Sequence, residues 1–290
     1  MICDALRAAI EAAVGRATGA AFSIEGIAPV GGGCIHKALA IKGGGARYFV
    51  KINEARFAAS FEAEVDGLLA LAAAGMRVPK PIAQAATDDA AFLVLEHLAF
   101  GQGTGASFRE LGRRLARQHG HRGPRFGWHR DNFIGLTPQS NVQCESWTQF
   151  WKRERLAPQL ALSADDELVQ SLGARVLEAL PRLLAGHDPA PALLHGDLWR
   201  GNAGFLANGT PAVFDPAVYH GDPEADLAMT ELFGGFPESF YEGYREVHPI
   251  AQGYRLRRVL YNLYHVLNHL NLFGAGYRDQ SVRMMESLLK

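Results

Sequence analysis

The residues whose types and spacing could do chemistry lie in the segment 195–202, which reads His-Gly-Asp-Leu-Trp-Arg-Gly-Asn. The pattern H-x-D-x-x-x-x-N suits phosphoryl transfer, because the aspartate can take the proton of an attacking hydroxyl while the asparagine binds a metal ion. A second acidic residue, Asp215, ends the apolar run at 212–214, 18 positions after Asp197. We therefore predict that Asp197 is the catalytic proton acceptor and that Asn202 and Asp215 bind Mg²⁺ through hard oxygen ligands.

Each of these three residues also has a purely structural interpretation. Asp197 could be a helix N-cap or turn residue, Asn202 a turn residue after Gly201, and Asp215 the end of a strand before an Asp-Pro turn. None of these interpretations accounts for the spacing of the three residues. Phosphoryl transfer from ATP to a small hydroxylated substrate does account for it.

A lysine in the first third of the chain is the candidate for binding nucleotide phosphates. Lys51 lies in the strand-like run 48–52, and a helical segment with Glu62 and Glu64 follows at once. A lysine–glutamate pair of this kind can hold the α- and β-phosphates of ATP. Of the two acids we favour Glu64. The alternative for Lys51 is a strand residue that faces solvent, which is the commoner case for a lysine.

Two further segments are predicted to bind ATP. The first is a glycine run between two strands, where backbone N–H groups can approach phosphates closely; it consists of Gly31, Gly32, Gly33, Cys34 and Ile35. Its sequence is neither G-x-G-x-x-G nor a Walker A motif, so a simple hairpin turn is the alternative. The second segment ends a buried strand, where backbone groups would meet adenine; it consists of Glu96, His97 and Leu98.

The elements around these residues change from strands to helices along the chain. Residue types and periodicity predict strands at 23–30, 35–42, 47–53 and 91–98 and a helix at 55–74. Later helices are predicted at 107–120, 145–162, 164–184, 222–233 and 254–273, with short strands at 192–195 and 212–215. The predicted fold class is α+β with two lobes. Residues 1–98 form a β-rich nucleotide-binding lobe, 99–105 a hinge, and 106–290 a helical lobe for catalysis and acceptor binding.

Composition narrows the function further. The chain has 290 residues, of which 48% are hydrophobic, enough to bury a core in each of two lobes. Its formal net charge is −1, so no basic field favours a nucleic acid or membrane partner. Three scattered cysteines indicate neither a disulfide framework nor a zinc site. The N-terminal residues 1–19 carry charges among apolar residues and predict an amphipathic helix, so we expect a cytoplasmic enzyme.

These motifs together resemble the fructosamine kinases, also called ketosamine 3-kinases, which have a fold like that of protein kinases and aminoglycoside phosphotransferases. The resemblance runs from about residue 26 to the C-terminus. It rests on the segments 30–35 (VGGGCI), 49–51 (FVK), 61–64 (FEAE), 95–98 (LEHL), 195–199 (HGDLW), 214–217 (FDPA) and 233–237 (FGGFP). Leu-Trp after His-Gly-Asp is more specific to this family than His-Gly-Asp alone.

The resemblance implies transfer of the ATP γ-phosphate to a sugar hydroxyl of a ketosamine, a fructosamine or ribulosamine carried by a small amine or a protein lysine. The phosphorylated adduct then releases its amine, which amounts to deglycation. It also implies that Glu64 partners Lys51, that Asp226 braces the catalytic loop, and that Trp199 faces the substrate sugar, with a buried core tryptophan as the alternative. His36 departs from the asparagine expected at its position.

Other functions remain open at this stage. The same chemistry could act on an aminoglycoside, choline or another alcohol, because the acceptor pocket is poorly defined by sequence. A nucleotide-binding module without turnover is disfavoured, since Lys51, Asp197, Asn202 and Asp215 are all present. A pair spaced as zinc ligands can be, His265 and His269, lacks a neighbouring glutamate and a third ligand, and we interpret it as core or cleft-lining. The preferred sugar and the oligomeric state stay undefined.

Overall fold

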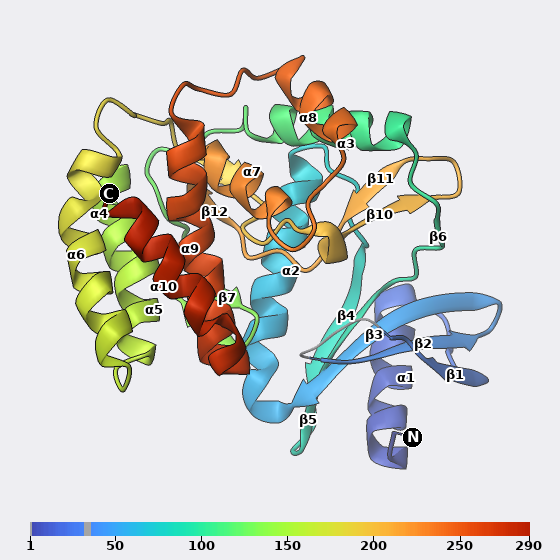
Figure 1. Cartoon of the computed structure of the whole chain (residues 1–290). Helices are drawn as coiled ribbons and strands as arrows, with labels where there is room; N and C mark the ends of the chain where they lie inside the picture. The colour runs from blue at the N-terminus through green and yellow to red at the C-terminus, as the bar shows by residue number, and fades with distance from the viewer. Residues whose placement is uncertain (1, 32–35) are drawn as a thin grey trace.

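The computed structural model describes residues 2–31 and 36–290, which form two lobes (Figure 1). The smaller lobe contains helix α1 (Asp4–Thr18) and a five-stranded antiparallel sheet with the order β1-β2-β3-β5-β4. Its strands are β1 (Gly26–Pro29), β2 (Lys37–Gly43), β3 (Ala46–Glu54), β4 (Pro81–Ala86) and β5 (Ala90–Glu96). A single turn η1 (Ala55–Phe57) and the helix α2 (Ala58–Ala73) connect β3 to β4.

Alternation along the central strands decides which side chains reach the site. Val50 of β3 and Val94 of β5 pack in the core shared with α1. Leu93, next to Val94, packs in the other core, which includes α2. Because successive residues of a strand face opposite sides, Lys51 is directed away from α1 and toward α2.

The larger lobe is mostly helical and contains three small sheets. Its helices are α3 (Gly105–Gln118), α4 (Trp147–Phe150), the π-helical η2 (Trp151–Leu156), α5 (Ala157–Leu162), α6 (Glu167–Leu183), η3 (Arg200–Asn202), α7 (Pro223–Glu231), α8 (Glu238–Arg245), α9 (Tyr254–Phe273), η4 (Ala275–Tyr277) and α10 (Arg278–Leu288). Its strands are β6 (Phe100–Gly101), β7 (Asn132–Ile134), β8 (Thr137–Gln139), β9 (Ala192–Leu194), β10 (Ala203–Leu206), β11 (Pro211–Val213) and β12 (Tyr219–Gly221). The sheets are β11-β10-β6, β12-β9 and β7-β8.

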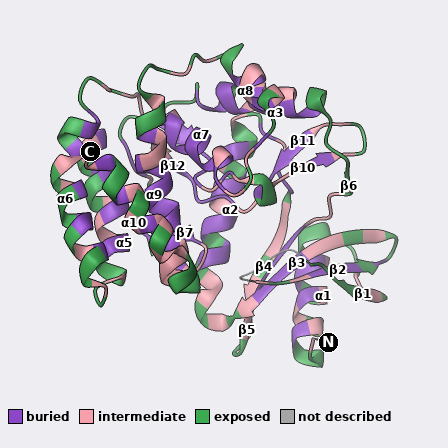
Figure 2. Ribbon diagram, viewed as in Figure 1, coloured by how far each residue is buried: buried purple, intermediate pink, exposed green. Residues whose placement is uncertain are grey.

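The core of the larger lobe lies around α7 and α9. Figure 2 shows α7 as almost wholly buried, and α9 is buried at every residue from Leu260 to Asn268. A helix that is buried on all sides cannot use its polar residues for solvation, so each of them needs a partner inside the protein. This requirement becomes important for the histidines of α9.

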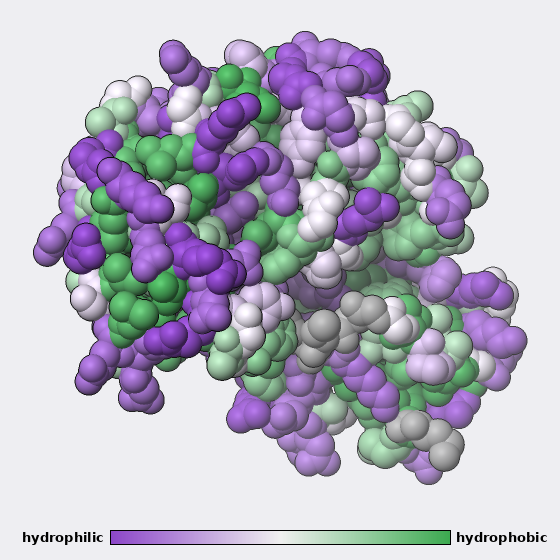
Figure 3. Space-filling view, in the orientation of Figure 1, coloured by the Kyte–Doolittle hydropathy of each residue, from purple (hydrophilic) through white to green (hydrophobic). Residues whose placement is uncertain are grey.

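The lobes meet through α2 and the end of β5. A Cβ atom added to Gly67 of α2 would lie 3.1 Å from the side chain of Pro216, so the helix packs closely against the segment that follows Asp215. The backbone N–H of Val213 donates to the carbonyl of Arg77 (2.9 Å), which joins β11 to the smaller lobe. Figure 3 shows the surface hollowed where the two lobes meet.

The predicted α+β fold is confirmed, with differences in detail. Helix α9 has the predicted bounds of 254–273, whereas β4, α8, α10 and several strands of two to four residues were not predicted. The helix predicted at 145–162 contains six π-helical residues at its centre. Phe100 and Gly101, inside the proposed hinge, already pair with β10 of the larger lobe. Among the described residues, no helix has the length and apolar character needed to cross a membrane.

Candidate active site

The segment 195–202 connects β9 to β10, and one buried carboxylate holds its backbone. Asp226 of α7 is 1% exposed and accepts hydrogen bonds from the backbone N–H groups of His195 (2.7 Å) and Gly196 (2.8 Å). Gly196 has a φ of 82°, and a Cβ there would lie 2.0 Å from the carbonyl oxygen of Ala217. Only glycine fits this position. The loop that presents Asp197 is therefore braced by Asp226 and has a fixed shape.

Asp197 and Asn202 lie in direct contact at the end of this loop. The Nδ2 of Asn202 donates to Asp197 Oδ2 (3.1 Å) and to the Asp197 carbonyl oxygen (2.9 Å). In this orientation the Oδ1 of Asn202 is the amide atom that can coordinate a cation. Burial and the nearby charge of Asp215 raise the pKa of Asp197 to about 7. A carboxylate of this basicity accepts a proton more readily than an ordinary aspartate does.

Lys51 joins the two lobes through an ion-pair network. Its Nζ donates to Glu64 Oε1 (2.7 Å) and to Asp215 Oδ1 (2.5 Å). Lys51 is 5% exposed, whereas the Asp215 side chain is 42% exposed and remains accessible. Of the two acids in α2, the structure places Glu64 beside Lys51. Glu62 reaches outward to Arg130 (3.4 Å).

The charge states in this network follow from burial and pairing. Burial opposes the charge on Lys51, but the carboxylates of Asp215 and Glu64 outweigh it and raise the Lys51 pKa above its ordinary value. Burial likewise raises the pKa of Glu64 to about 7, against the opposing effect of Lys51. Lys51 is thus a charged donor that two carboxylates hold in place.

The backbone at Asp215 adopts an unusual conformation. Asp215 has a φ of 58°, in the left-handed region that side-chain-bearing residues seldom occupy. The residue before it contributes to the loop as well, because the carbonyl of Phe214 lies 3.1 Å from His195 Nε2. Strained backbone of this kind is concentrated at functional sites. Here it directs the Asp215 carboxylate toward Lys51.

The predicted glycine loop falls largely outside the described residues. Gly32, Gly33, Cys34 and Ile35 are not described, and Gly31 is exposed and outside any strand. The next residue is His36, and its Nδ1 lies 2.9 Å from Asn53 Nδ2. Burial and the neighbouring Lys51 lower the pKa of His36 to about 4, so its imidazole is neutral beside the lysine.

At the end of β5, the acidic side chain of Glu96 is engaged by Arg77. Glu96 accepts two hydrogen bonds from Arg77, at 2.9 Å and 2.5 Å. Burial opposes ionisation, but the bonds from Arg77 hold the Glu96 pKa below its ordinary value. His97 and Leu98 follow as half-buried residues without regular secondary structure. Any nucleotide contact from Glu96 must therefore use its main chain.

Trp199 is half-buried and belongs to an aromatic cluster beside the catalytic loop. Its ring lies 6.1 Å from that of Phe233, measured between centroids, and Phe233 lies 4.6 Å from His269. Tyr277 joins them, 5.1 Å from His269. The tryptophan is thus neither a fully buried core residue nor a free surface one. This cluster borders the catalytic loop on the side of α9.

The sequence left His265 as a core or cleft-lining residue, and the structure places it beside Asp197. Its imidazole Nδ1 lies 3.9 Å from Asp197 Oδ1, although the two residues are 68 positions apart. Burial lowers the pKa of His265 to about 3, so it is neutral. The only available signal was the spacing of His265 and His269 along a helix, and that spacing does not indicate which loop the histidines face.

The segment after α3 makes a second contact between the lobes. The indole Nε1 of Trp128 donates to Asp66 Oδ2 in α2 (2.7 Å), and His129 Nε2 lies 3.2 Å from Asp66 Oδ1. These contacts tie the helix that carries Glu64 to the larger lobe. This contact fixes the position of Glu64 relative to the catalytic loop.

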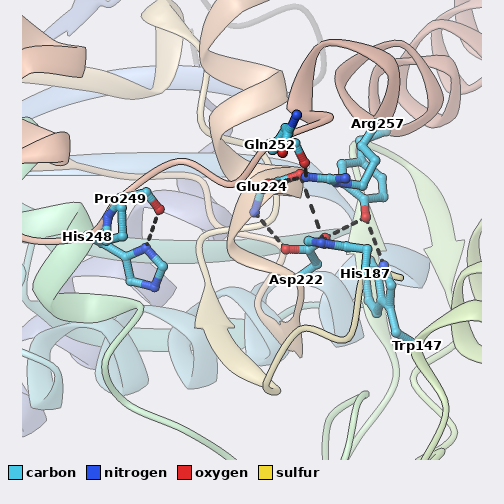
Figure 4. A network of polar contacts seen from close by, with 9 residues as sticks. Trp147, His187, Asp222, Glu224, His248, Pro249, Gln252 and Arg257 are labelled. Atoms are coloured by element: carbon cyan, nitrogen blue, oxygen red, sulfur yellow. Dashed lines mark hydrogen bonds and ion pairs between the residues drawn. The ribbon is translucent and has the colours of Figure 1, made fainter. Parts of the chain in front are cut away.

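A separate polar cluster lies at the start of α7 (Figure 4). Among the described residues, His187, Asp222 and Glu224 have ligand atoms close enough to hold a metal ion. However, Arg257 already binds both oxygens of Glu224 (2.6 and 2.8 Å), and Asp222 accepts from Tyr261 (2.5 Å). An arginine paired in this way disfavours a cation. We interpret the cluster as a structural link between α7 and α9.

The chain is similar to a well-defined group of proteins. The model of the fructosamine kinase family matches residues 6–290. A relative from Synechocystis, named as a ketoamine kinase, is 45% identical over 96% of this chain and 95% of its own. The protein-ribulosamine 3-kinase of Arabidopsis thaliana is 39% identical over 94% of this chain and 85% of its own.

Solved structures agree with these sequence matches. A structure from Thermobifida fusca, titled as a fructosamine-3-kinase, is 30% identical, covers 99% of each chain and superposes with a TM-score of 0.85. A second structure described as a fructosamine-3-kinase, from Haemophilus somnus, is 29% identical over 97% of each chain, with a TM-score of 0.91. An aminoglycoside phosphotransferase at 16% identity and a TM-score of 0.61, over 96% of this chain and 98% of its own, shares the fold.

Proposed function

Because the chain belongs to the fructosamine kinase family, we propose that it is an ATP-dependent kinase of ketosamines, with the cluster around Asp197 as its active site. The acceptor is the 3-hydroxyl of a fructosamine or ribulosamine, in keeping with the name of the plant relatives. One observation supports this most strongly. Lys51 and Asp215, 164 residues apart, meet at 2.5 Å beside the Asp197–Asn202 pair.

In this proposal each residue has a task in an in-line transfer. ATP with Mg²⁺ supplies the transferable phosphoryl group. Asp197 accepts the proton of the attacking hydroxyl while that oxygen forms its bond to phosphorus and the bond from phosphorus to the ADP oxygen breaks. Asn202 and Asp215 provide the oxygen ligands for the metal. Lys51, positioned by Glu64, binds the phosphate oxygens.

The remaining predicted site residues complete the proposal. The run from Gly31 to Ile35 covers the phosphates through its backbone N–H groups, and the residues from Glu96 to Leu98 bind adenine through their main chain. Trp199 faces the acceptor, because an aromatic ring suits the apolar C–H side of a sugar. The half-exposed position of Trp199 next to the loop supports this role.

The fate of the phosphorylated product indicates the role of the reaction in the cell. Phosphorylation of a ketosamine yields an unstable adduct that releases the amine, so the enzyme acts in deglycation. The acceptor is then an alcohol, and the amine it carries is either a small molecule or a protein lysine.

The test is ATP consumption with Mg²⁺ against a panel of fructoselysine, ribuloselysine, an aminoglycoside and choline. We expect turnover on the ketosamines alone. Asp197→Asn should retain ATP binding and lose about 10²–10⁴-fold in kcat, because the proton acceptor is removed while the shape of the side chain is kept. Turnover confined to the aminoglycoside or choline would refute the ketosamine assignment, and near-normal turnover in the variant would remove Asp197 from the mechanism.

A further inference from the structure

His265 is a buried residue of α9 with one ring nitrogen, Nδ1, that has no hydrogen-bond partner among the described residues. It is 5% exposed, and its Nδ1 makes no hydrogen bond to any part of the chain that the structure describes. Buried polar atoms are nearly always hydrogen-bonded, so an exception needs an explanation. The neighbouring imidazole does not supply one, because His269 Nδ1 bonds to the backbone carbonyl of His265 (2.8 Å) and not to its ring.

The unpartnered nitrogen lies next to the proposed proton acceptor. His265 Nδ1 and Asp197 Oδ1 are 3.9 Å apart, which is too long for a direct hydrogen bond. Asp197 is not pulled toward the histidine, because Asn202 holds its other carboxylate oxygen at 3.1 Å. Two polar atoms of different side chains therefore lie side by side with no hydrogen bond between them.

A separation of 3.9 Å is short enough for two adjacent hydroxyls of one sugar to reach both atoms. A vicinal diol can place one hydroxyl against Asp197 Oδ1 and the other against His265 Nδ1, each at an ordinary hydrogen-bond distance of about 2.8 Å. The ring of His265 is fixed for this purpose, since α9 is buried on all sides there and Tyr264 packs 5.1 Å away.

We propose that His265 is a specificity-determining residue whose Nδ1 binds the hydroxyl next to the one that Asp197 activates. The inference rests on the proposed ketosamine kinase function and extends it to the acceptor's configuration. If phosphorylation occurs at the 3-hydroxyl, the adjacent oxygens are those on C2, a carbonyl in the open-chain ketosamine, and on C4; we assign the 4-hydroxyl to His265. A neutral imidazole can donate to or accept from a hydroxyl.

The experiment combines one side-chain change with one substrate change. The kcat/KM for a fructosamine and for its 4-deoxy analogue is measured in the wild type and in His265→Leu. We expect a loss of about tenfold from either change alone, typical of one buried hydrogen bond. The two changes together should also cost about tenfold, and not a hundredfold, because both remove the same bond. The effect should appear in the KM for the ketosamine and leave the KM for ATP unchanged.

Conservative variants distinguish the Nδ1 contact from a packing role. His265→Asn places a polar atom close to the position of Nδ1 and should restore most of the discrimination against the 4-deoxy analogue. His265→Gln places it near Nε2 and should not. Asn268→Leu is the matched control on α9, because Asn268 bonds to Gln159 and Ile134 instead. It should lower thermal stability and keep the tenfold preference for the 4-hydroxyl.

The outcomes separate this inference from the function on which it rests. Equal kcat/KM of the wild type for the two substrates would overturn the role of His265 and leave the kinase assignment intact. A hundredfold combined loss would also overturn it, since independent effects multiply. Absence of wild-type turnover on any ketosamine would overturn the proposed function and this inference with it.

Discussion

Replacing Asp226 by asparagine should loosen the catalytic loop without touching any substrate. The carboxylate accepts from His195 N (2.7 Å), Gly196 N (2.8 Å) and His119 Nε2 (3.1 Å), all in the interior. An asparagine keeps the shape but has one accepting oxygen. Its amide nitrogen is a donor, so it cannot accept from the N–H group that faces it. One buried hydrogen bond is lost, and one buried donor is left without an acceptor.

The structure sets the size of this effect. An unsatisfied buried donor costs roughly 1–3 kcal/mol, which corresponds to a decrease in Tm of about 2–5 °C in a chain of this length. Because the displaced backbone directly precedes Asp197, kcat should fall at least about tenfold while ATP binding persists. Circular dichroism melts and steady-state kinetics measure the two effects. Asp88→Asn, an exposed change, should leave both unaltered.

The difference in stability should also depend on pH. Burial alone would raise the Asp226 pKa, but the hydrogen bond and charge of His119 and the bonds from the loop hold it below its ordinary value of 3.8. A depressed folded-state pKa means that the carboxylate's stabilising contribution is present above about pH 4 and is lost as the pH falls through the folded value. The Tm gap between wild type and Asp226→Asn should therefore narrow below about pH 4. A gap that is absent at pH 7, or constant down to pH 3, would refute this account of Asp226.

Two other predictions concern the loop and the phosphate-binding lysine. Gly196→Ala should abolish activity and lower the Tm by more than Gly209→Ala does. Both glycines have a φ near 80°, but only at Gly196 does a Cβ lie 2.0 Å from a carbonyl oxygen, so equal Tm losses would contradict the steric argument. Lys51→Met should reduce kcat/KM for ATP by at least about 100-fold in a coupled assay, with the fold retained in circular dichroism, because Glu64 can become protonated once its partner is gone. Unchanged use of ATP would remove Lys51 from the phosphate site.

Parts of this fold could be predicted because their sequence patterns are long or chemically distinctive. The helix at 254–273 has the predicted bounds, since its apolar residues recur over five turns. The strand β4 was missed because Pro-Ile-Ala-Gln-Ala-Ala has neither alternation nor β-branched enrichment. Strands of three residues, such as β7 and β12, are too short to show a period. Their positions are set by tertiary pairing.

The same distinction applies to the site. Asp197 and Asn202 lie five positions apart, so one local pattern identifies both, and the structure places them in contact. The contact between Lys51 and Asp215 could be predicted only by assuming phosphoryl transfer first, because 164 residues separate them and no local pattern links them. His265 could not be located in this way. Its neighbour Asp197 is reached only after α9 packs against α7, and no local pattern encodes that contact.

The proton acceptor lies on a loop with a fixed backbone, whereas the residues proposed to contact the acceptor are single side chains. The transfer machinery rests on a loop whose backbone is fixed by Asp226 and by the close fit at Gly196, so its shape does not depend on the acceptor. In our proposal the acceptor side is formed instead by single side chains, Trp199 of the loop 195–202 and, on a buried helix, His265, whose Nδ1 lies 3.9 Å from Asp197 Oδ1. Changing such a side chain alters which hydroxyls are bound without moving the proton acceptor. Acceptor choice in this chain should therefore respond to substitutions at His265 far more than the rate of ATP use does.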